Sequence, residues 1–108
     1  MRILPKEQVI KILKHFDFDD KLTFVKAIDF EPDCKIYVLK TVTNDKYALV
    51  CRDLEMDDLG AEDRILKNEL GIIVLQRFVL KNAKESDYWY IDHSFDRFSY
   101  YFSLIRIL

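Results

Sequence analysis

The length and composition of this 108-residue chain predict one compact domain. Half of the residues are hydrophobic, 14% are aromatic, and only two glycines and two prolines occur, which excludes a disordered chain and leaves little room for glycine-rich phosphate loops. The formal charge is only −2, which argues against a nucleic-acid-binding protein with a strongly basic surface.

The first element expected is a helix from Pro5 to Phe16. Apolar residues recur there at helical spacing, with lysines on the opposite side. Pro5 suits the first turn of a helix, because its missing N–H would have no partner at that position. The acidic stretch at 17–20 breaks the pattern. The apolar side of this helix is expected to consist of Val9, Ile10, Ile12, Leu13 and Phe16.

Three antiparallel strands are expected next, joined as a meander. Apolar and polar residues alternate over 22–30, which predicts a strand with one buried face, and residues 31–33 supply a turn. Residues 35–42 are rich in β-branched and aromatic side chains. The pair at 44–45, Asn-Asp, tolerates turn conformations and reverses the chain into a third strand over 47–51.

A middle helix is expected after the third strand. Asp57 and Asp58 favour a helix start, because carboxylates stabilise the positive end of the helix dipole. Gly71 is expected to end this helix, since glycine readily adopts the left-handed conformation of a C-terminal cap.

Two later segments leave helix and strand open. The apolar block at the start of 72–80 favours a buried strand, which a loop at 81–86 would join as a hairpin to a strand over 87–91. Ser94 suits the N-cap of a last helix, whereas the density of aromatic residues over 95–107 fits a strand as well.

These elements predict an α+β fold in a single domain over residues 1–108. Its antiparallel sheet is expected to have about five strands, with an N-terminal helix, a middle helix and either a helix or a strand at the C-terminus. Cys34 and Cys51 lie in apolar strand segments, so buried free thiols in a reducing compartment are favoured over a disulfide. No signal peptide is visible, and the longest uncharged apolar run, 71–76, is too short for a bilayer. We expect a cytoplasmic protein without membrane contact.

The strongest functional signal is an acidic run between residues 53 and 63, which holds six acids and no base. Setting these six apart from the total of 19 leaves 13 acids against 17 bases, so the remainder carries +4. Such asymmetry favours a docking surface for a basic protein partner, although a solvated loop and helix start explain the same acids. The acid-rich turns at 17–20 and 29–33 would extend this surface if the fold brings them alongside. The acidic run consists of Asp53, Glu55, Asp57, Asp58, Glu62 and Asp63.

Tyr88 and Tyr90 are the second candidate for partner binding. In a strand these two rings share one face and Trp89 points to the other. Exposed tyrosines are effective anchors at protein interfaces, while core packing is the competing explanation for them. Direct nucleic-acid stacking is not expected, because no cluster of arginine and lysine surrounds the rings.

His15 and His93 are the only histidines and supply the one catalytic hypothesis. They are able in principle to act as an acid–base pair in metal-free hydrolysis, with Asp92 or Asp96 orienting His93. The cysteines and histidines show no zinc-site spacing, and the acidic run does not follow the calcium-loop pattern. Neither a metal nor a cofactor is expected.

Three functions follow from these signals. The favoured one is a small cytoplasmic inhibitor or immunity-type protein, not an enzyme, that neutralises a basic toxic enzyme such as a nuclease by covering its active site. The second is a small metal-independent nuclease or hydrolase that uses His15 and His93. The third is a structural or regulatory module that self-associates through residues 95–108, so the expected state is a monomer or a weak homodimer.

Overall fold

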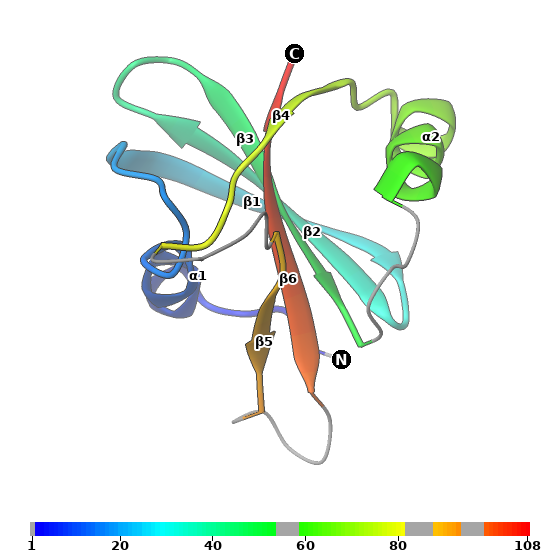
Figure 1. The fold of residues 1–108 in the computed structure, drawn as a ribbon, viewed down its shortest axis with the longest axis horizontal. Helices are drawn as coiled ribbons and strands as arrows, with labels where there is room; N and C mark the ends of the chain where they lie inside the picture. The colour runs from blue at the N-terminus through cyan, green and yellow to red at the C-terminus, as the bar shows by residue number, and fades with distance from the viewer. Residues whose placement is uncertain (1, 54–58, 82–87, 94–98) are drawn as a thin grey trace.

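The computed structural model describes residues 2–53, 59–81, 88–93 and 99–108. In these residues an antiparallel six-stranded sheet carries one helix on each face, which confirms the predicted α+β fold (Figure 1). The elements in chain order are α1 (Lys6–Leu13), β1 (Leu22–Glu31), β2 (Cys34–Thr41), β3 (Lys46–Arg52), α2 (Leu59–Leu70), β4 (Val74–Arg77), β5 (Tyr90–Asp92) and β6 (Tyr100–Ile107).

The strand order confirms the predicted meander and corrects the predicted hairpin. Strands β1, β2 and β3 pair antiparallel in sequence, and β3 then pairs with β6. Strands β4 and β5 both pair with β6 rather than with each other. Strand β6 is long enough to pair with β5 through its first residues and with β4 through its last, so the two short strands lie end to end along it. The proposed hairpin loop lies mostly outside the described residues.

The described part of the C-terminal segment forms a strand, β6, rather than a helix. Residues 94–98, which include the expected cap Ser94, lie outside the described part of the chain. Strand β6 lies between β3 on one side and β4 and β5 on the other. Phe102 and Leu104 face the α1 side while Ile105 and Ile107 face the α2 side. A strand buried on both faces reads as a continuous apolar run, which is why its periodicity did not distinguish it from a helix.

Helix α1 is shorter than expected. Pro5 occupies the N-cap rather than the first turn, and its carbonyl accepts hydrogen bonds from the N–H groups of Gln8 (3.0 Å) and Val9 (3.2 Å). The helix ends at Leu13, but the Phe16 side chain is still fully buried in the core on the α1 side, and its backbone forms an isolated antiparallel bridge with Leu80. The predicted apolar side is buried except for Ile10.

Two turns follow the predicted backbone chemistry. Gly71 has φ 67°, and its N–H donates to the carbonyl of Lys67 at 3.0 Å, which confirms it as the end of α2. Asn44 has φ 64° between β2 and β3, in the left-handed region that asparagine tolerates. Helix α2 begins at Leu59, and the expected initiators Asp57 and Asp58 lie outside the described residues.

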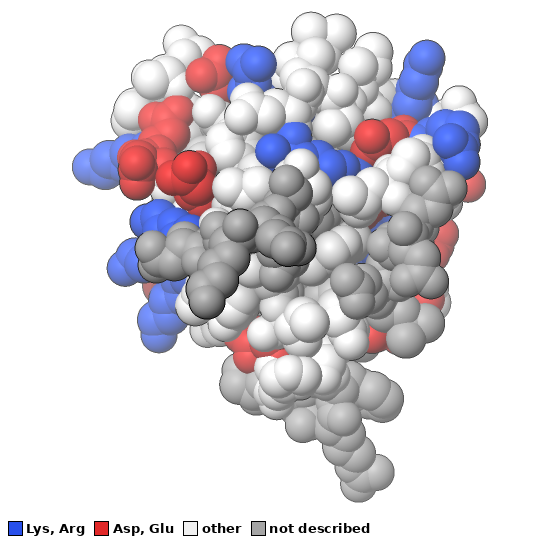
Figure 2. All heavy atoms as spheres, viewed as in Figure 1, with Lys and Arg blue, Asp and Glu red and all other residues white. Residues whose placement is uncertain are grey.

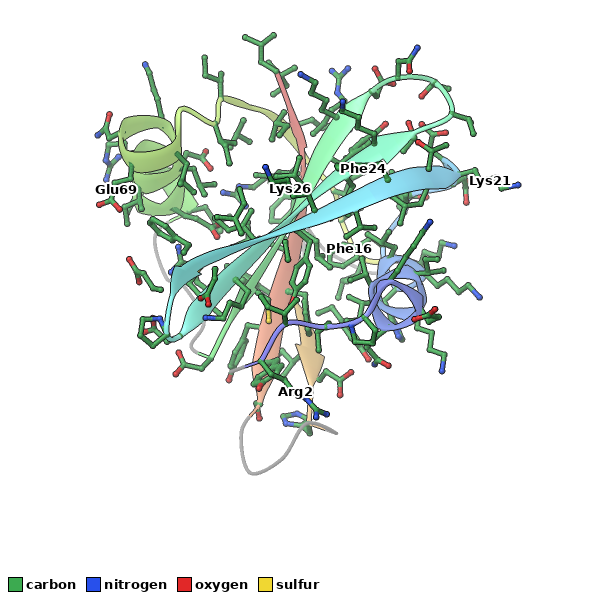
Figure 3. The ribbon with its side chains drawn as sticks, turned by 180° about the vertical axis from the view of Figure 1, so that it is seen from behind. Arg2, Phe16, Lys21, Phe24, Lys26 and Glu69 are labelled. Atoms are coloured by element: carbon green, nitrogen blue, oxygen red, sulfur yellow. The ribbon has the colours of Figure 1, made fainter. Side chains whose placement is uncertain are left out.

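Strand β1 differs from the expectation of one buried face. Every one of its ten residues is half-buried or exposed, and Phe24 is 45% exposed. The strand lies at the edge of the sheet, where it pairs only with β2, and register shifts interrupt that pairing near both ends. Figure 3 shows Phe24 and Lys26 on this strand. The Lys40 ammonium lies 5.7 Å from the centroid of the Phe24 ring.

The two cysteines are buried free thiols, as predicted. Cys51 packs in the core between the sheet and α1, whereas Cys34 packs in the core between the sheet and α2. They therefore point to opposite faces of the sheet and cannot meet in a disulfide. Burial raises the pKa of Cys34 to about 11 and that of Cys51 to about 12, so both stay protonated at neutral pH.

Candidate functional site

Glu62 corrects the expectation that the whole acidic run lies on the surface. Its side chain is 0% exposed and lies between two arginines of the sheet. Oε1 is 3.4 Å from Nε of Arg52, at the end of β3, and Oε2 is 3.0 Å from Nη2 of Arg77, at the end of β4. Helix α2 packs this side chain against the sheet. The carboxylate therefore forms ion pairs inside the protein and cannot contact a partner.

Asp63 belongs to the same network but stays partly accessible. Its carboxylate pairs with Nη2 of Arg77 and is 41% exposed. Arg77 also donates to the carbonyl of Leu59 at 3.5 Å, which ties the start of α2 to β4. Two guanidinium groups and two carboxylates thus neutralise one another inside the molecule. Glu55, Asp57 and Asp58 lie outside the described residues, but both flanks of their segment, Arg52 and Leu59, are held by this network.

The turn between β1 and β2 brings further acids beside Asp53. The N–H of Asp53 donates to the carbonyl of Asp33 at 3.3 Å. Glu31 and Asp33 are exposed and Asp53 is half-buried, and none of these three side chains forms an ion pair within the described residues. We call these three residues the acidic end. Of the two acid-rich turns noted in the sequence, the one at 29–33 therefore lies beside Asp53, the first residue of the acidic run.

The two bases beside the acidic end in sequence and strand pairing, Lys35 and Arg52, are both buried and paired with other residues. Lys35 is only 4% exposed and donates to Asp29 and to the backbone carbonyl of Glu31. Arg52 is buried against Glu62. Figure 1 places the β1–β2 turn and the end of β3 together, and acidic groups line the corresponding lower right edge of Figure 2. Elsewhere on that view, acidic and basic groups lie side by side.

Strand β5 places the aromatic candidates near the acidic end. Tyr101 of β6 pairs with Arg52 on one side and with Ile91 on the other. Ile91 is thus two strands away from the end of β3, roughly 10 Å at the usual strand spacing. Ile91 is 40% exposed and is the apolar side chain that the sequence did not single out. The sequence around Ile91 is apolar and aromatic, so it did not predict that this side chain is exposed to solvent.

The Tyr90 side chain mainly contacts residues of the protein itself. Its ring stacks on His15, with ring centroids 3.9 Å apart and an interplanar angle of 12°. Its hydroxyl donates to Oδ2 of Asp92 at 3.4 Å. Burial and the Asp92 charge raise the pKa of Tyr90. Tyr88 and Tyr90 are both half-buried while Trp89 is buried.

The two histidines belong to different local arrangements. His15 is exposed at the end of α1 and stacks on Tyr90, whereas Nδ1 of His93 lies 2.6 Å from Oγ of Ser99. No ring contact or hydrogen bond in the described residues joins the two imidazoles. Asp92, a proposed partner of His93, accepts a hydrogen bond from Tyr90 instead. Among the described residues, no group of His, Cys, Asp and Glu is arranged to hold a metal ion.

Most apolar side chains of the segment proposed for self-association are buried where the segment is described, whereas Leu108 is exposed. Phe102, Leu104 and Ile105 are at most 1% exposed. The buried apolar side chains of β6 pack in the two core clusters, one beneath α1 and one beneath α2.

No family model, curated protein or solved structure matches this chain. Within the described ranges, no helix has the length and apolar character needed to cross a bilayer.

Proposed function

We propose that this chain is a small cytoplasmic inhibitor of the immunity type, which docks through its acidic end on a basic toxic enzyme such as a nuclease. The observation that supports this most is the backbone hydrogen bond between Asp53 and Asp33, because it brings together, at one end of the sheet, three carboxylates that form no ion pair within the described residues. Glu55, Asp57 and Asp58 follow Asp53 in the chain, and the sequence places no lysine or arginine between Asp53 and Asp63.

Charge and apolar contact have separate parts in this docking. Uncompensated carboxylates accelerate the encounter with a cationic surface, and salt weakens that effect. The exposed Ile91 supplies an apolar anchor beside the charges, and such anchors mainly set the dissociation rate. The buried network around Glu62 contributes by holding β3, β4 and α2 together at this end.

The first experiment tests docking by charge reversal. The tagged protein is used to capture partners from its native cytosol, and the association rate of the captured partner is then measured. A Glu31→Lys, Asp33→Lys, Asp53→Lys variant should associate about 10- to 100-fold more slowly at low salt, because electrostatic steering raises association rates by such factors. The difference should shrink at high salt.

The matched control reverses three acids elsewhere, Asp17, Asp19 and Glu69, which are exposed on other parts of the surface. This variant has the same net charge as the first and should lose much less of the association rate. Equal rates for the two variants would rule out the acidic end as the docking site. Ile91→Ala should raise the dissociation rate with little change in association.

Inhibition is tested separately from docking. If the captured partner is an enzyme, a stoichiometric amount of this protein should suppress its activity, and the acidic-end variant should require a higher concentration. A partner that binds tightly and remains fully active would contradict the inhibitor assignment while leaving the docking surface in place.

A further inference from the structure

A pocket of about 410 Å³ lies on the α1 side of the molecule, away from the acidic end. It is open to solvent and is lined by residues of α1, by the segment that leads into β1, and by Lys81. Its volume falls in the lower part of the range of small-molecule sites, roughly 300–1,000 Å³.

Hydrogen bonds fix the walls of this pocket. The N–H of Asp17 donates to the carbonyl of Val79 at 2.8 Å, and the N–H of Lys81 donates to the carbonyl of His15 at 2.9 Å. On the opposite wall, Oδ2 of Asp20 accepts a hydrogen bond from Oγ1 of Thr43 at 2.6 Å. The pocket is thus preformed, so a ligand would not need to order its walls.

The floor of the pocket is apolar and continuous with the core. Leu13 and Phe18 are buried members of the α1-side core, and the Phe18 ring packs edge-on against Tyr47 at 4.9 Å. Ile10 is 36% exposed and Leu22 is half-buried at the sides. Ile10 and Leu22 therefore present apolar surface to solvent inside the pocket, whereas the core residues below them are buried.

Lys14 and Lys21 are exposed residues that line the pocket, and neither forms an ion pair within the described residues. The two acids of the rim are already engaged: Asp19 lies 3.9 Å from Nζ of Lys81, and Asp20 accepts from Thr43 and from the N–H of Lys21. Hydrogen bonds from Thr41 and Thr43 lower the pKa of Asp20, so it stays ionised. Figure 3 shows Lys21 beside the start of β1, on the same side of the view as α1.

We propose that this pocket binds a small amphipathic carboxylate of the size of a medium-chain fatty acid. Its apolar chain would lie on Ile10, Leu13, Phe18 and Leu22, and its carboxylate would meet Lys14 and Lys21. Two flexible ammonium groups act as point charges that satisfy a single anion without a fixed geometry. The carboxylates of Asp19 and Asp20 at the same rim disfavour a multiply charged head group such as a phosphate.

The test compares three ligands with the same ten-carbon chain, decanoate, decanol and decyltrimethylammonium, each below its micelle concentration. Binding is followed by calorimetry, and its location by amide chemical shifts. Decanoate should bind at least about tenfold more tightly than decanol, the factor that one additional favourable charge contact of about 1.4 kcal/mol provides. Decyltrimethylammonium should bind more weakly than either.

Two double variants decide the role of the lysines. Lys14→Ser with Lys21→Ser should abolish the advantage of decanoate over decanol but leave decanol binding unchanged. Lys26→Ser with Lys67→Ser, which removes the same charge from exposed positions outside the pocket, should retain the advantage. Equal affinity for decanoate and decanol, an advantage that survives the first double variant, or shifts confined to another surface would each overturn the proposal. The proposed docking function stands or falls independently, because it uses neither lysine.

Discussion

A single side chain, Glu62, joins three elements at the acidic end. Its carboxylate oxygens bond Arg52 of β3 and Arg77 of β4 from within α2. Within the described residues, Nη2 of Arg52 and Nη1 of Arg77 are buried without a hydrogen-bond partner. The two guanidinium groups therefore depend on Glu62 for much of their compensation, and its loss would leave buried positive charge unpaired.

We expect Glu62→Gln to lower the free energy of unfolding by about 3 kcal/mol, as is typical when one partner of a buried ion pair is removed. Urea unfolding followed by circular dichroism measures the change. Glu69→Gln, at an exposed position of the same helix, is the control and should change stability by less than about 0.5 kcal/mol. A loss below about 1 kcal/mol for Glu62→Gln would contradict the assigned role.

At the scale of the elements, the end of α2 depends on one backbone conformation. Gly71 has φ 67°, and the next N–H, that of Ile72, donates to the carbonyl of Leu66 at 3.1 Å. A Cβ at Gly71 would meet no atom within 4 Å, so space is not the constraint there. The constraint is the left-handed conformation itself, which L residues adopt at a cost.

Substitution by alanine should therefore have opposite effects on stability at Gly60, within α2, and at Gly71, just after its end. Gly71→Ala should destabilise the protein by about 1 kcal/mol, because alanine is strained at positive φ. Gly60→Ala, at an exposed helical position, should stabilise it by about 0.5 kcal/mol through higher helix propensity. Thermal unfolding of both variants is the measurement, and shifts of the same sign would contradict this account.

At the scale of the whole molecule, a formal charge of −2 conceals a separation of charge along the first three strands. Glu31, Asp33 and Asp53 lie at one end of these strands. Toward the other end, Lys40 pairs with Lys46 across β2 and β3, and Lys40 also pairs with Phe24 of β1. Like charges directly opposite each other reduce sheet stability slightly. The near-neutral total thus does not preclude a strong local field at the acidic end.

The ionisable groups buried in the core determine how stability should depend on alkaline pH. Burial raises the pKa of Cys34 from 9.0 to about 11, of Cys51 from 9.0 to about 12, and of Tyr37 from 10.0 to about 12. The raised native pKa values mean that the folded protein holds these protons more tightly than the unfolded chain does. The resulting contribution to the free energy of unfolding is fully present below pH 9 and is lost as pH rises through about 12. Each group should contribute a slope of about 1.4 kcal/mol per pH unit once its unfolded form ionises.

Urea unfolding between pH 8 and 10.5 measures this dependence. The natural protein should begin to lose stability near pH 9, the ordinary pKa of its thiols. A Cys34→Ala, Cys51→Ala variant should hold its own stability until about pH 10, where tyrosine begins to ionise. A natural protein with constant stability up to pH 10.5 would show that these groups titrate alike in the native and unfolded states.

What the sequence determined by itself was local. Helical spacing identified α1, the turn residues after β1 and β2 identified the meander, and Gly71 marked the end of α2. The apolar setting of the cysteines also predicted their burial as free thiols. Each of these features depends on a few neighbouring residues, whose periodicity and backbone preferences act before any distant contact forms.

Only the tertiary structure decided which acids are available to a partner and where the last strands pair. Glu62 and Asp53 look alike in the acidic run, but Glu62 faces Arg77 from fifteen residues away, whereas Asp53 meets the turn that contains Asp33. Strand β6 likewise draws β4 and β5 to itself and prevents their hairpin. These outcomes depend on packing two helices against opposite faces of one sheet, which brings together residues that the chain keeps far apart.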